Sequence, residues 1–396
     1  METVSLKNGR ERSLLRHHPW IYSGALEPFQ HEIQAGETVR VADVHGETLG
    51  YGSFSTASQI RVRMLSFNPE EVPCEDFISR RVAGAVELRK KDGALFSSCC
   101  RLVNAENDGL PGMVADFYAS WVVCQFTTAG AEHWKEAFAK AMMEHVPGCL
   151  GVSSRRDADA RMREHLTVAP GLEILAGAEP PPEITVEENG LKFAIDPRKG
   201  HKTGFYIDQR EAREAVGRFA RGRRVLNCFS YTGGFGIYAA ANGAISVEQV
   251  DASADALELA RRNAELNALG TPMEYSCRDV FQYLRKLRDM GRTFDMIVLD
   301  PPKFAEGKSQ IMKAARGYKD INLLAMKLLS PGGILATFSC SGAVSPEFFD
   351  QILAEAAADA RRDFRIIART GHCIDHPVAL SFPEGRYLKG VILKAF

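Results

Sequence analysis

The chain has 396 residues, of which 45% are hydrophobic and 25% charged, and its formal net charge is −1 at pH 7. These values are typical of a water-soluble globular protein with two or three domains. They exclude a membrane-spanning protein, because no apolar run reaches about 18 residues, and a chain that binds polyanions through its overall charge.

Cysteine usage and the N-terminal sequence indicate a protein of the reducing cytoplasm. The nine cysteines are scattered, without a C-x-x-C pair or the Cys/His spacing of a zinc site. Disulfides are rare in the cytoplasm, and an odd number of thiols fits that compartment. The first twenty residues lack the apolar core of a secretory signal. We therefore expect a cytoplasmic protein without a metal site and without a membrane partner.

Residues 1–75 predict a small β-barrel or β-sandwich. In residues 60–65, Ile-Arg-Val-Arg-Met-Leu, apolar and basic side chains alternate, so one face of this strand is apolar and the other carries Arg61 and Arg63. A basic cluster lies in residues 7–18, where one glutamate accompanies Lys7, Arg10, Arg12 and Arg16. This cluster is either a solvated basic face or a contact for a polyanion.

Residues 76–182 predict a mixture of helices and strands. Residues 76–91 and 132–146 have the apolar spacing of amphipathic helices, and residues 112–128 predict a β-hairpin. The three consecutive prolines at 180–182 form a stiff break in the chain. We place a domain boundary there.

Residues 183–396 alternate apolar runs with helical patterns, which predicts a doubly wound, mostly parallel α/β sheet. Its strands are predicted at residues 223–229, 244–251, 273–279, 294–300, 333–340, 364–370 and 386–396. No helical pattern separates the last two runs. Because parallel neighbours need a long crossover, we expect the last strand to be antiparallel.

Ligands of such sheets bind beyond the carboxyl ends of the strands, so the residues that end each run are site candidates. The first run ends in the loop 227–235, Asn-Cys-Phe-Ser-Tyr-Thr-Gly-Gly-Phe. Its glycines let backbone approach a ligand, although a plain tight turn also explains them. Asp251 and Asp279 end the next two runs, where they could bind a ribose and an adenine amino group or simply cap helices. Because the loop lacks G-x-G-x-x-G, the combination favours S-adenosylmethionine over NAD.

The fourth run ends in Asp300 and the fifth in Cys340, and neighbouring strands would bring both to one cleft. Two prolines after Asp300 stop the strand and hold the loop rigid. A thiol beside a methyl donor and an acid fits methylation of a pyrimidine at C5. Thiolate addition to C6 would make C5 nucleophilic, and Asp300 would stabilise the charge that develops near N3.

An ordinary cysteine has a pKa near about 8.5, so Cys340 would need activation. Backbone amides of the turn at Ser341 and Gly342, or proton transfer coupled to the attack, are candidates for this help. The alternative is that Cys340 is a small, buried apolar residue at the end of a strand.

A set of motifs makes the chain similar, over essentially its full length, to the bacterial 23S rRNA (cytosine-C5)-methyltransferases of the RlmI type. They are RHHPWIYSGAL, SQIRVRML, RLVNAENDGLPGMVADFY, GHKTGFYIDQR, VLNCFSYTGGFG, VLDPPKF, GYKDIN, TFSCSG and PEGRYLKG. The resemblance implies an N-terminal PUA β-barrel that binds RNA over residues 1–75 and a small α/β middle domain over residues 76–182. Residues 183–396 would form a Rossmann-like class I methyltransferase domain, seven-stranded with the last strand antiparallel.

The resemblance also implies which residues bind S-adenosylmethionine and RNA. The motif at 200–210 would close over the cofactor and contribute Tyr206, Asp208 and Arg210. The methionine part would lie against Asn227, Phe229, Ser230 and Gly233, the ribose against Asp251 and the adenine against Asp279, with Asp300 close to the reactive end. The RNA contacts would be Arg10, Arg16, Arg61, Arg63 and Lys303.

The same resemblance places the nucleophile at Cys340. Many RNA cytosine-C5 enzymes carry a second cysteine in the motif that holds Asp300, and this chain has none there, so the group that assists the elimination stays open. Cys228, inside the glycine loop, is the rival thiol, and we expect it to pack beneath the cofactor.

Two other functions stay open at this stage. One is methylation of a guanine in rRNA, which needs no thiol. The other is a catalytically inactive RNA-binding assembly factor. The sequence also leaves open the target nucleotide, the base that removes the C5 proton, the choice between naked 23S rRNA and a large-subunit assembly intermediate, and the presence of a homodimer.

Overall fold

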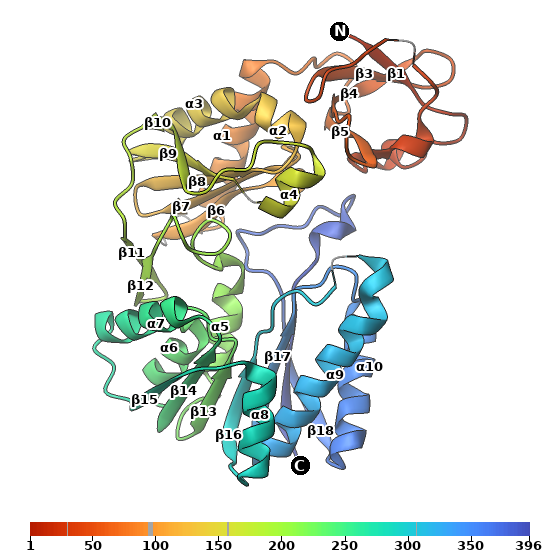
Figure 1. The fold of residues 1–396 in the computed structure, drawn as a ribbon. Coiled ribbons are helices and arrows are strands. Elements are labelled where there is room, and N and C mark those ends of the chain that lie inside the picture. The colour runs from red at the N-terminus through yellow and green to blue at the C-terminus, as the bar shows by residue number, and fades with distance from the viewer. Residues whose placement is uncertain (30, 94–97, 157, 306) are drawn as a thin grey trace. The chain divides into compact units, whose positions relative to one another are not determined.

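The computed structural model describes residues 1–29, 31–93, 98–156, 158–305 and 307–396 (Figure 1). The chain forms two compact units, and each unit takes segments from distant parts of the sequence. The first consists of Met1–Glu187, Ile195–Ile207 and Ile374–Gly385, and the second of Glu188–Ala194, Asp208–Cys373 and Arg386–Phe396. The domain boundaries expected at residues 75 and 182 stay predictions.

The first unit begins with a five-stranded sheet built from the N-terminal strands. These are β1 (Thr3–Ser5), β2 (Trp20–Tyr22), β3 (Thr38–Ala42), β4 (Thr48–Phe54) and β5 (Ile60–Ser66), with short turns η1 (Leu14–Arg16) and η2 (Ser23–Ala25) between them. The strand order is β1-β3-β4-β5-β2, with β1 parallel to β3 and the other pairs antiparallel. Val62 and Met64 of β5 are buried in the core, whereas Arg61 and Arg63 are not, as the alternation predicts.

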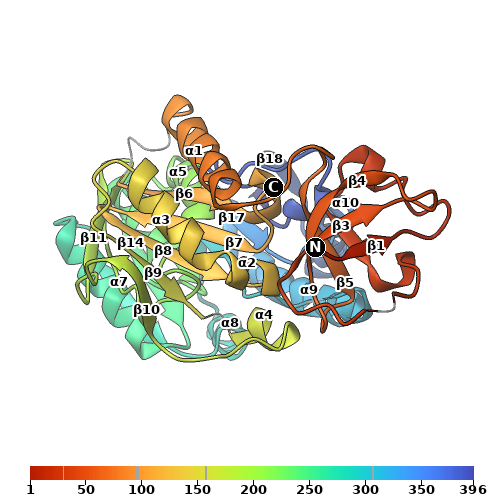
Figure 2. The same ribbon diagram turned by 90° about the horizontal axis from the view of Figure 1, so that it is seen from above.

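A second five-stranded sheet follows in the first unit. Its strands are β6 (Cys99–Asn104), β7 (Met113–Tyr118), β8 (Trp121–Phe126), β9 (Gly151–Arg155) and β10 (Leu172–Gly177), in the order β10-β9-β8-β7-β6. Helices α1 (Glu75–Lys91) and α3 (Lys135–His145) lie side by side and share one apolar core with this sheet (Figure 2). The remaining elements are η4 (Ala105–Asp108), α2 (Ala129–His133) and α4 (Ala158–Arg163). The single helix predicted at 132–146 is divided at Trp134, where ψ is 4° and α2 ends.

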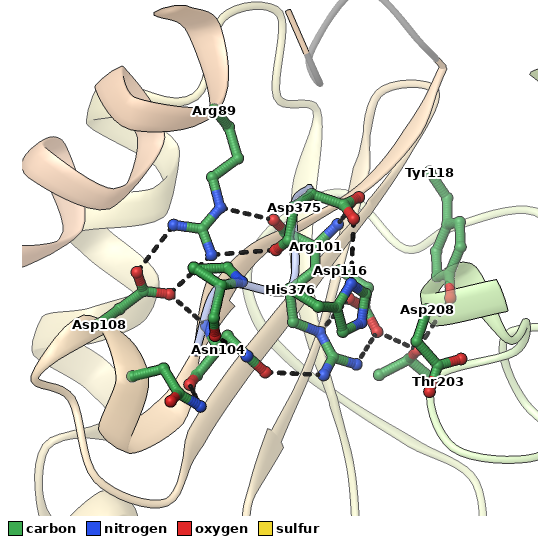
Figure 3. A network of polar contacts seen from close by, with 12 residues as sticks. Arg89, Arg101, Asn104, Asp108, Asp116, Tyr118, Thr203, Asp208, Asp375 and His376 are labelled. Atoms are coloured by element: carbon green, nitrogen blue, oxygen red, sulfur yellow. Dashed lines mark hydrogen bonds and ion pairs between the residues drawn. The ribbon is translucent and has the colours of Figure 1, made fainter. Parts of the chain in front are cut away.

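A buried ion-pair network lies at the edge strand β6 of this sheet (Figure 3). The guanidinium of Arg89 donates to both carboxylate oxygens of Asp108 at 2.8 Å, and Arg101 donates to both oxygens of Asp116 at 2.7 and 2.9 Å. Bidentate pairs of this kind are among the stronger polar contacts in proteins, and they leave no charge unpaired on burial.

The same network fixes two segments that come from far along the chain (Figure 3). Thr203 donates its hydroxyl hydrogen to Asp116 and shares a second hydrogen bond with the hydroxyl of Tyr118. Asp375 accepts a hydrogen bond from the backbone N–H of Arg101 at 3.0 Å. The segments Ile195–Ile207 and Ile374–Gly385 are therefore anchored in the first unit, although their sequences lie among those of the second.

The second unit is built around a seven-stranded sheet (Figure 1). Its strands are β13 (Arg224–Cys228), β14 (Ser246–Asp251), β15 (Met273–Cys277), β16 (Phe294–Leu299), β17 (Leu329–Ser339), β18 (Phe364–Thr370) and β19 (Lys389–Ala395). The order is β15-β14-β13-β16-β17-β19-β18. The first five strands are parallel, and β19 runs antiparallel to both β17 and β18. The predicted doubly wound sheet with an antiparallel last strand is confirmed.

Helices cover both faces of this sheet. They are α5 (Arg210–Gly217), α6 (Gly234–Ala241), α7 (Ala254–Leu266), α8 (Val280–Asp289), α9 (Ile311–Leu328) and α10 (Pro346–Ala360). Side chains from α8, α9 and α10 share one apolar cluster with the sheet, and those from α5 and α6 share another. Successive strand residues such as Val225 and Leu226 belong to opposite clusters, as expected for a parallel sheet buried on both sides.

The remaining elements are short. They are the hairpin of β11 (Ile184–Glu188) and β12 (Leu191–Ile195), and the turns η5 (Ile207–Gln209), η6 (Lys308–Gln310) and η7 (Pro383–Gly385). Among the helices that the structure describes, none is long and apolar enough to cross a membrane.

Candidate active site

The carboxyl ends of β14 and β15 carry the two acids that the sequence marks as cofactor contacts. β14 ends at Asp251, which pairs in register with Cys277 at the end of β15. Asp279 follows as the N-cap of α8, and its carboxylate accepts a hydrogen bond from the backbone N–H of Gln282 at 2.9 Å. One oxygen of Asp279 thus caps the helix, while the side chain as a whole is exposed and open to a ligand.

Asp251 also holds the loop that follows β13. Its two oxygens accept hydrogen bonds from the backbone N–H groups of Tyr231 at 2.8 Å and Ser253 at 2.9 Å. The loop needs this support, because Phe229 and Tyr231 have φ angles of 56° and 48°, in the left-handed region that side chains disfavour. A carboxylate has about four lone-pair positions, so Asp251 can still accept further hydrogen bonds.

The glycines of the loop serve packing within the protein as well as access for a ligand. Gly233 has a φ of 82°, a conformation that glycine adopts without strain. A Cβ atom at Gly236 in α6 would collide with the side-chain amide of Gln249 on β14. Gln249 in turn accepts a hydrogen bond from the side chain of Asn227 at 2.8 Å. Glycine at position 236 therefore allows α6 to lie close to β14, directly after the loop.

Three buried polar atoms near these strand ends have no hydrogen-bond partner among the residues that the structure describes. They are Oδ1 of Asn227, Oγ of Ser230 and Oε1 of Gln209. Buried polar atoms are nearly always paired in folded proteins, so these three atoms could accept hydrogen bonds from a polar ligand or donate them to it. Oxygen acceptors together with the carboxylates of Asp251 and Asp279 suit S-adenosylmethionine, because its amino, ribose and adenine groups are hydrogen-bond donors.

The residues before and within α5 connect this region to the loop that follows β16. Asp208 and Arg210 are both buried, and Asp208 accepts a hydrogen bond from the hydroxyl of Tyr387 at 2.6 Å. The side-chain amide of Gln209 donates to Asp300 at 2.9 Å. The sequence does not mark Gln209 and Tyr387 as site residues. Their partners lie 91 and 179 residues away along the chain, and no local pattern points to them.

Asp300 and Cys340 lie at the same edge of the sheet, on neighbouring parallel strands. Asp300 is the first residue after β16 and Cys340 the first after β17. The register pairs Leu299 with Thr337, one strand residue before Asp300 and three before Cys340. Cys340 is partly exposed and forms no disulfide. It is therefore not the fully buried small residue of the alternative interpretation.

The two serines that flank Cys340 are fixed by one tyrosine. Ser339 donates its hydroxyl hydrogen to the hydroxyl of Tyr318 at 3.0 Å, and Ser341 shares a hydrogen bond with the same hydroxyl at 3.0 Å. Ser339, Ser341 and Tyr318 are all completely buried. Their contacts hold the backbone on both sides of Cys340 and leave its own side chain as the accessible one.

The rival thiol, Cys228, is in a different environment. It is completely buried in the apolar cluster that β13 shares with α8, α9 and α10. Burial raises the pKa of the Cys228 thiol, and the charge of Glu248 raises it further. A thiolate is the nucleophilic form of cysteine, so this environment disfavours Cys228 as a nucleophile.

The other predicted residues belong to the first unit or to the exposed surface. Tyr206 lies in the first unit, where its hydroxyl is 3.2 Å from Nδ1 of His201 and its ring is 4.4 Å from the ammonium of Lys202. Lys303 is exposed in the loop after β16. Arg16 is exposed at the end of η1.

The two arginines of β5, Arg61 and Arg63, differ in the contacts that their side chains make within the protein. Arg63 forms an ion pair with Glu164 at 2.8 Å and lies 3.8 Å from Glu106, with its side chain only 11% exposed. These contacts favour a role in holding the first unit together. Arg61 lines a hollow of about 460 Å³ with Phe29, Phe54, Glu27 and Glu32. Its guanidinium also donates to the backbone carbonyl oxygens of Ser55 and Thr56.

Arg10 lines a second hollow in the same sheet region, of about 410 Å³. Arg12, Trp20 and Tyr22 line it too, and none of its lining residues that the structure describes is acidic. Arginines beside aromatic rings are typical of surfaces that bind single-stranded nucleic acid.

Comparison with known proteins agrees with this fold. The model of the S-adenosylmethionine-dependent methyltransferase family matches residues 159–377, and that of the PUA-like domain matches residues 4–67. The class is therefore an S-adenosylmethionine-dependent methyltransferase with an N-terminal PUA-like domain. This confirms the fold class and the cofactor that the sequence predicts.

Relatives match this chain over nearly its whole length. Ribosomal RNA large subunit methyltransferase I from Shewanella amazonensis is 48% identical over 397 residues, covering 99% of both chains. The protein of the same name from Tolumonas auensis is 48% identical over 396 residues, with the same coverage. The chain belongs to the ribosomal RNA large subunit methyltransferase I family.

Solved structures share the fold at lower sequence identity. A Streptococcus mutans protein assigned as an S-adenosylmethionine-dependent methyltransferase has a TM-score of 0.85 and 21% identity, covering 100% of both chains. A second solved structure, described as a methyltransferase in complex with SAH, has a TM-score of 0.84 and 21% identity, and the match covers 100% of both chains. At this identity the likeness shows the fold alone.

Proposed function

We propose that this protein transfers a methyl group from S-adenosylmethionine to C5 of a cytosine in 23S rRNA, through a transient covalent bond between Cys340 and C6. Its relatives at 48% identity are named ribosomal RNA large subunit methyltransferases, and its N-terminal domain is PUA-like. The substrate is 23S rRNA, either naked or in a large-subunit assembly intermediate.

The position and exposure of Cys340 carry the proposal. It is a partly exposed thiol directly after β17, beside the strand that ends before Asp300. Methylation of a guanine nitrogen would need no thiol at this edge. Cytosine C5 does need one, because that carbon is too weak a nucleophile to attack a methyl group unaided.

The chain's own residues would hold the cofactor at the strand ends. Asp251 accepts hydrogen bonds from the ribose hydroxyls, Asp279 receives the adenine amino group, and Asn227, Ser230 and the loop backbone hold the methionine part. Bound there, S-adenosylmethionine supplies an electrophilic methyl group. Asp208 before α5 and Arg210 at its start would add to these cofactor contacts.

The reaction then follows from the placement of Cys340 and Asp300. The Cys340 thiolate forms a bond to C6, and the electrons of the C5–C6 double bond make C5 nucleophilic. Asp300, held by Gln209 at 2.9 Å, would in its protonated form donate a hydrogen bond to N3 and so stabilise the negative charge that develops there. After C5 has taken the methyl group, a base that is not yet identified takes the C5 proton, and the electrons of that C–H bond restore the C5–C6 double bond and expel the thiolate.

The RNA would be held by basic residues on several surfaces. Arg10, Arg16 and Arg61 lie in the PUA-like domain, and Lys303 is in the exposed loop beyond Asp300. Their charges can pair with phosphates, and the aromatic rings of the hollows beside Arg10 and Arg61 can stack on bases. Arg63 is less suited to this role, because its two acidic neighbours already pair with it.

Nucleoside analysis of methylated rRNA tests the proposal. Unmodified 23S rRNA is incubated with S-adenosylmethionine and the wild-type protein, Cys340→Ala or Cys228→Ala, and its digested nucleosides are identified by mass spectrometry. We expect 5-methylcytidine with the wild-type protein and with Cys228→Ala, and none with Cys340→Ala. A methylated guanosine, or full activity of Cys340→Ala, would overturn the proposal.

A further inference from the structure

A lysine is buried against the turn that follows the proposed nucleophile. Lys389 is the first residue of β19 and pairs with Ser339, the last residue of β17. Only 7% of Lys389 is exposed. Buried lysines are rare unless they are paired with an acid, because removing an ammonium group from water costs several kcal/mol.

The ammonium group of Lys389 closes the turn that follows Cys340. Its Nζ donates hydrogen bonds to the backbone carbonyl oxygens of Ser341 and Val344, each at 2.7 Å. Tyr318 holds Ser339 and Ser341 through their hydroxyl groups. The thiol therefore lies in a turn that is fixed by Tyr318 on α9 and by Lys389 on β19.

No carboxylate balances the charge of Lys389 within the part of the chain that the structure describes. Burial lowers the pKa of Lys389 to about 8, and the charged thiolate of Cys340 opposes that shift. Two other titratable groups contact residues next to Lys389 or its turn: Tyr318, whose hydroxyl bonds the serines, and His372, which accepts a hydrogen bond from the backbone N–H of Leu388 at 3.2 Å. Tyr387, two residues before Lys389, donates to Asp208 instead.

We propose that Lys389 is a positioning residue that prepares Cys340 for attack by fixing its turn and sharing its proton. Lys389 is an ammonium group below its pKa of about 8. In the neutral form that this lowered pKa makes accessible, it keeps two N–H groups for the two carbonyls and has a lone pair for the thiol proton. The S–H bond breaks as a third N–H bond forms, which leaves a thiolate beside an ammonium group. The step needs no other reactant. Its importance for methyl transfer rests on the proposed function, in which Cys340 attacks C6.

The pH dependence of thiol alkylation tests this inference without RNA or cofactor. The full-length protein is treated with iodoacetamide between pH 6 and 10, and modification of each cysteine is followed by peptide mass spectrometry. In the wild-type protein, the midpoint of Cys340, which is the pH at which its alkylation reaches half of the maximum rate, should be about one unit lower than for Cys277. Cys277 is an exposed thiol in the same unit. A midpoint equal to or above that of Cys277 would overturn the proposal, whatever any variant shows.

A variant then assigns the effect to the charge of Lys389. Lys389→Gln keeps N–H donors for the carbonyls but cannot take a proton, and it should slow alkylation of Cys340 about tenfold at pH 7. Lys394→Gln, the same change at an exposed position of β19, should leave Cys340 unaffected. Tyr318→Phe removes the hydroxyl contacts and keeps the charge, so the midpoint of Cys340 should stay in place.

The outcomes separate this inference from the proposed function. An unchanged Cys340 profile in folded Lys389→Gln would mean that Lys389 only braces the turn. If Lys389→Gln unfolds, the normally buried Cys228 becomes alkylated, and this identifies the loss of structure. In that case the comparison of Cys340 with Cys277 in the wild-type protein tests the proposal by itself. Should Cys340 show the low midpoint while Cys340→Ala still methylates rRNA, the pairing with Lys389 stands and the covalent mechanism fails.

Discussion

Replacing Asp251 by asparagine should weaken cofactor binding and loosen the loop after β13. The carboxylate accepts hydrogen bonds from two backbone N–H groups, at 2.8 and 2.9 Å, and asparagine offers one acceptor oxygen where the carboxylate has two. Losing one charge-assisted hydrogen bond costs about 1.5–3 kcal/mol of folding free energy. A ribose hydroxyl loses its acceptor in the same way, so the Kd for S-adenosylmethionine should rise roughly 10- to 150-fold.

Isothermal titration calorimetry measures the affinity, and urea unfolding measures the stability of the same samples. Asp255→Asn is the matched control, because Asp255 is an exposed residue in the first turn of α7, four positions further on. It should change the Kd by less than twofold. An unchanged Kd for Asp251→Asn would refute the placement of the ribose at β14. A loss of stability alone would leave Asp251 as a residue that only holds the loop.

Three further predictions concern the two units and the RNA. Asp116→Asn breaks the bidentate pair with the buried Arg101, so urea denaturation should show a free energy of unfolding lower by about 3–5 kcal/mol. The control Glu87→Gln breaks an exposed ion pair and should lower it by less than about 1 kcal/mol. The pKa of Lys389, lowered to about 8, means that above this pH the unfolded chain binds one more proton than the folded chain. Stability should therefore rise between about pH 8 and 10, and Lys389→Met should flatten that rise; an identical pH profile would contradict the burial of the amine. Arg10→Gln should weaken rRNA binding and reduce the slope of log Kd against log salt by about 1, and an unchanged slope would remove Arg10 from the phosphate contacts.

The sequence predicts the second unit well because its signals are local. Each parallel strand is a short apolar run, and the residue that ends the run lies at the carboxyl edge of the sheet. The amino-acid pattern alone therefore suffices to place Asp251, Asp300 and Cys340 at that edge. The antiparallel last strand also follows from the chain, because too few residues separate it from its neighbour for a parallel crossover.

Contacts between distant parts of the sequence could not be predicted in this way. Lys389 is 48 residues beyond Ser341, and only the pairing of β19 with β17 brings its ammonium group to that carbonyl. The alternation in β5 correctly placed Arg63 on the polar face. It could not show that Glu164, about 100 residues later in the chain, would form an ion pair with Arg63.

The division of the chain into units shows the same limit of local signals. Thr203 and Asp375 lie in stretches whose sequence neighbours belong to the second unit, yet their hydrogen bonds anchor them in the first. A buried ion-pair network of this kind has no periodic signature, because its members are spread over more than two hundred residues.

Trapping of the covalent intermediate tests the central claim most directly. The wild-type protein is incubated with S-adenosylmethionine and rRNA that contains 5-fluorocytidine, and the adduct is mapped by mass spectrometry. Fluorine at C5 prevents the proton loss that precedes release, so an enzyme that uses a thiol stays bound to its substrate. We predict an RNA adduct on Cys340 and none on Cys228. An adduct on Cys228 would overturn the site, and no adduct from a protein that still methylates normal rRNA would contradict the covalent mechanism.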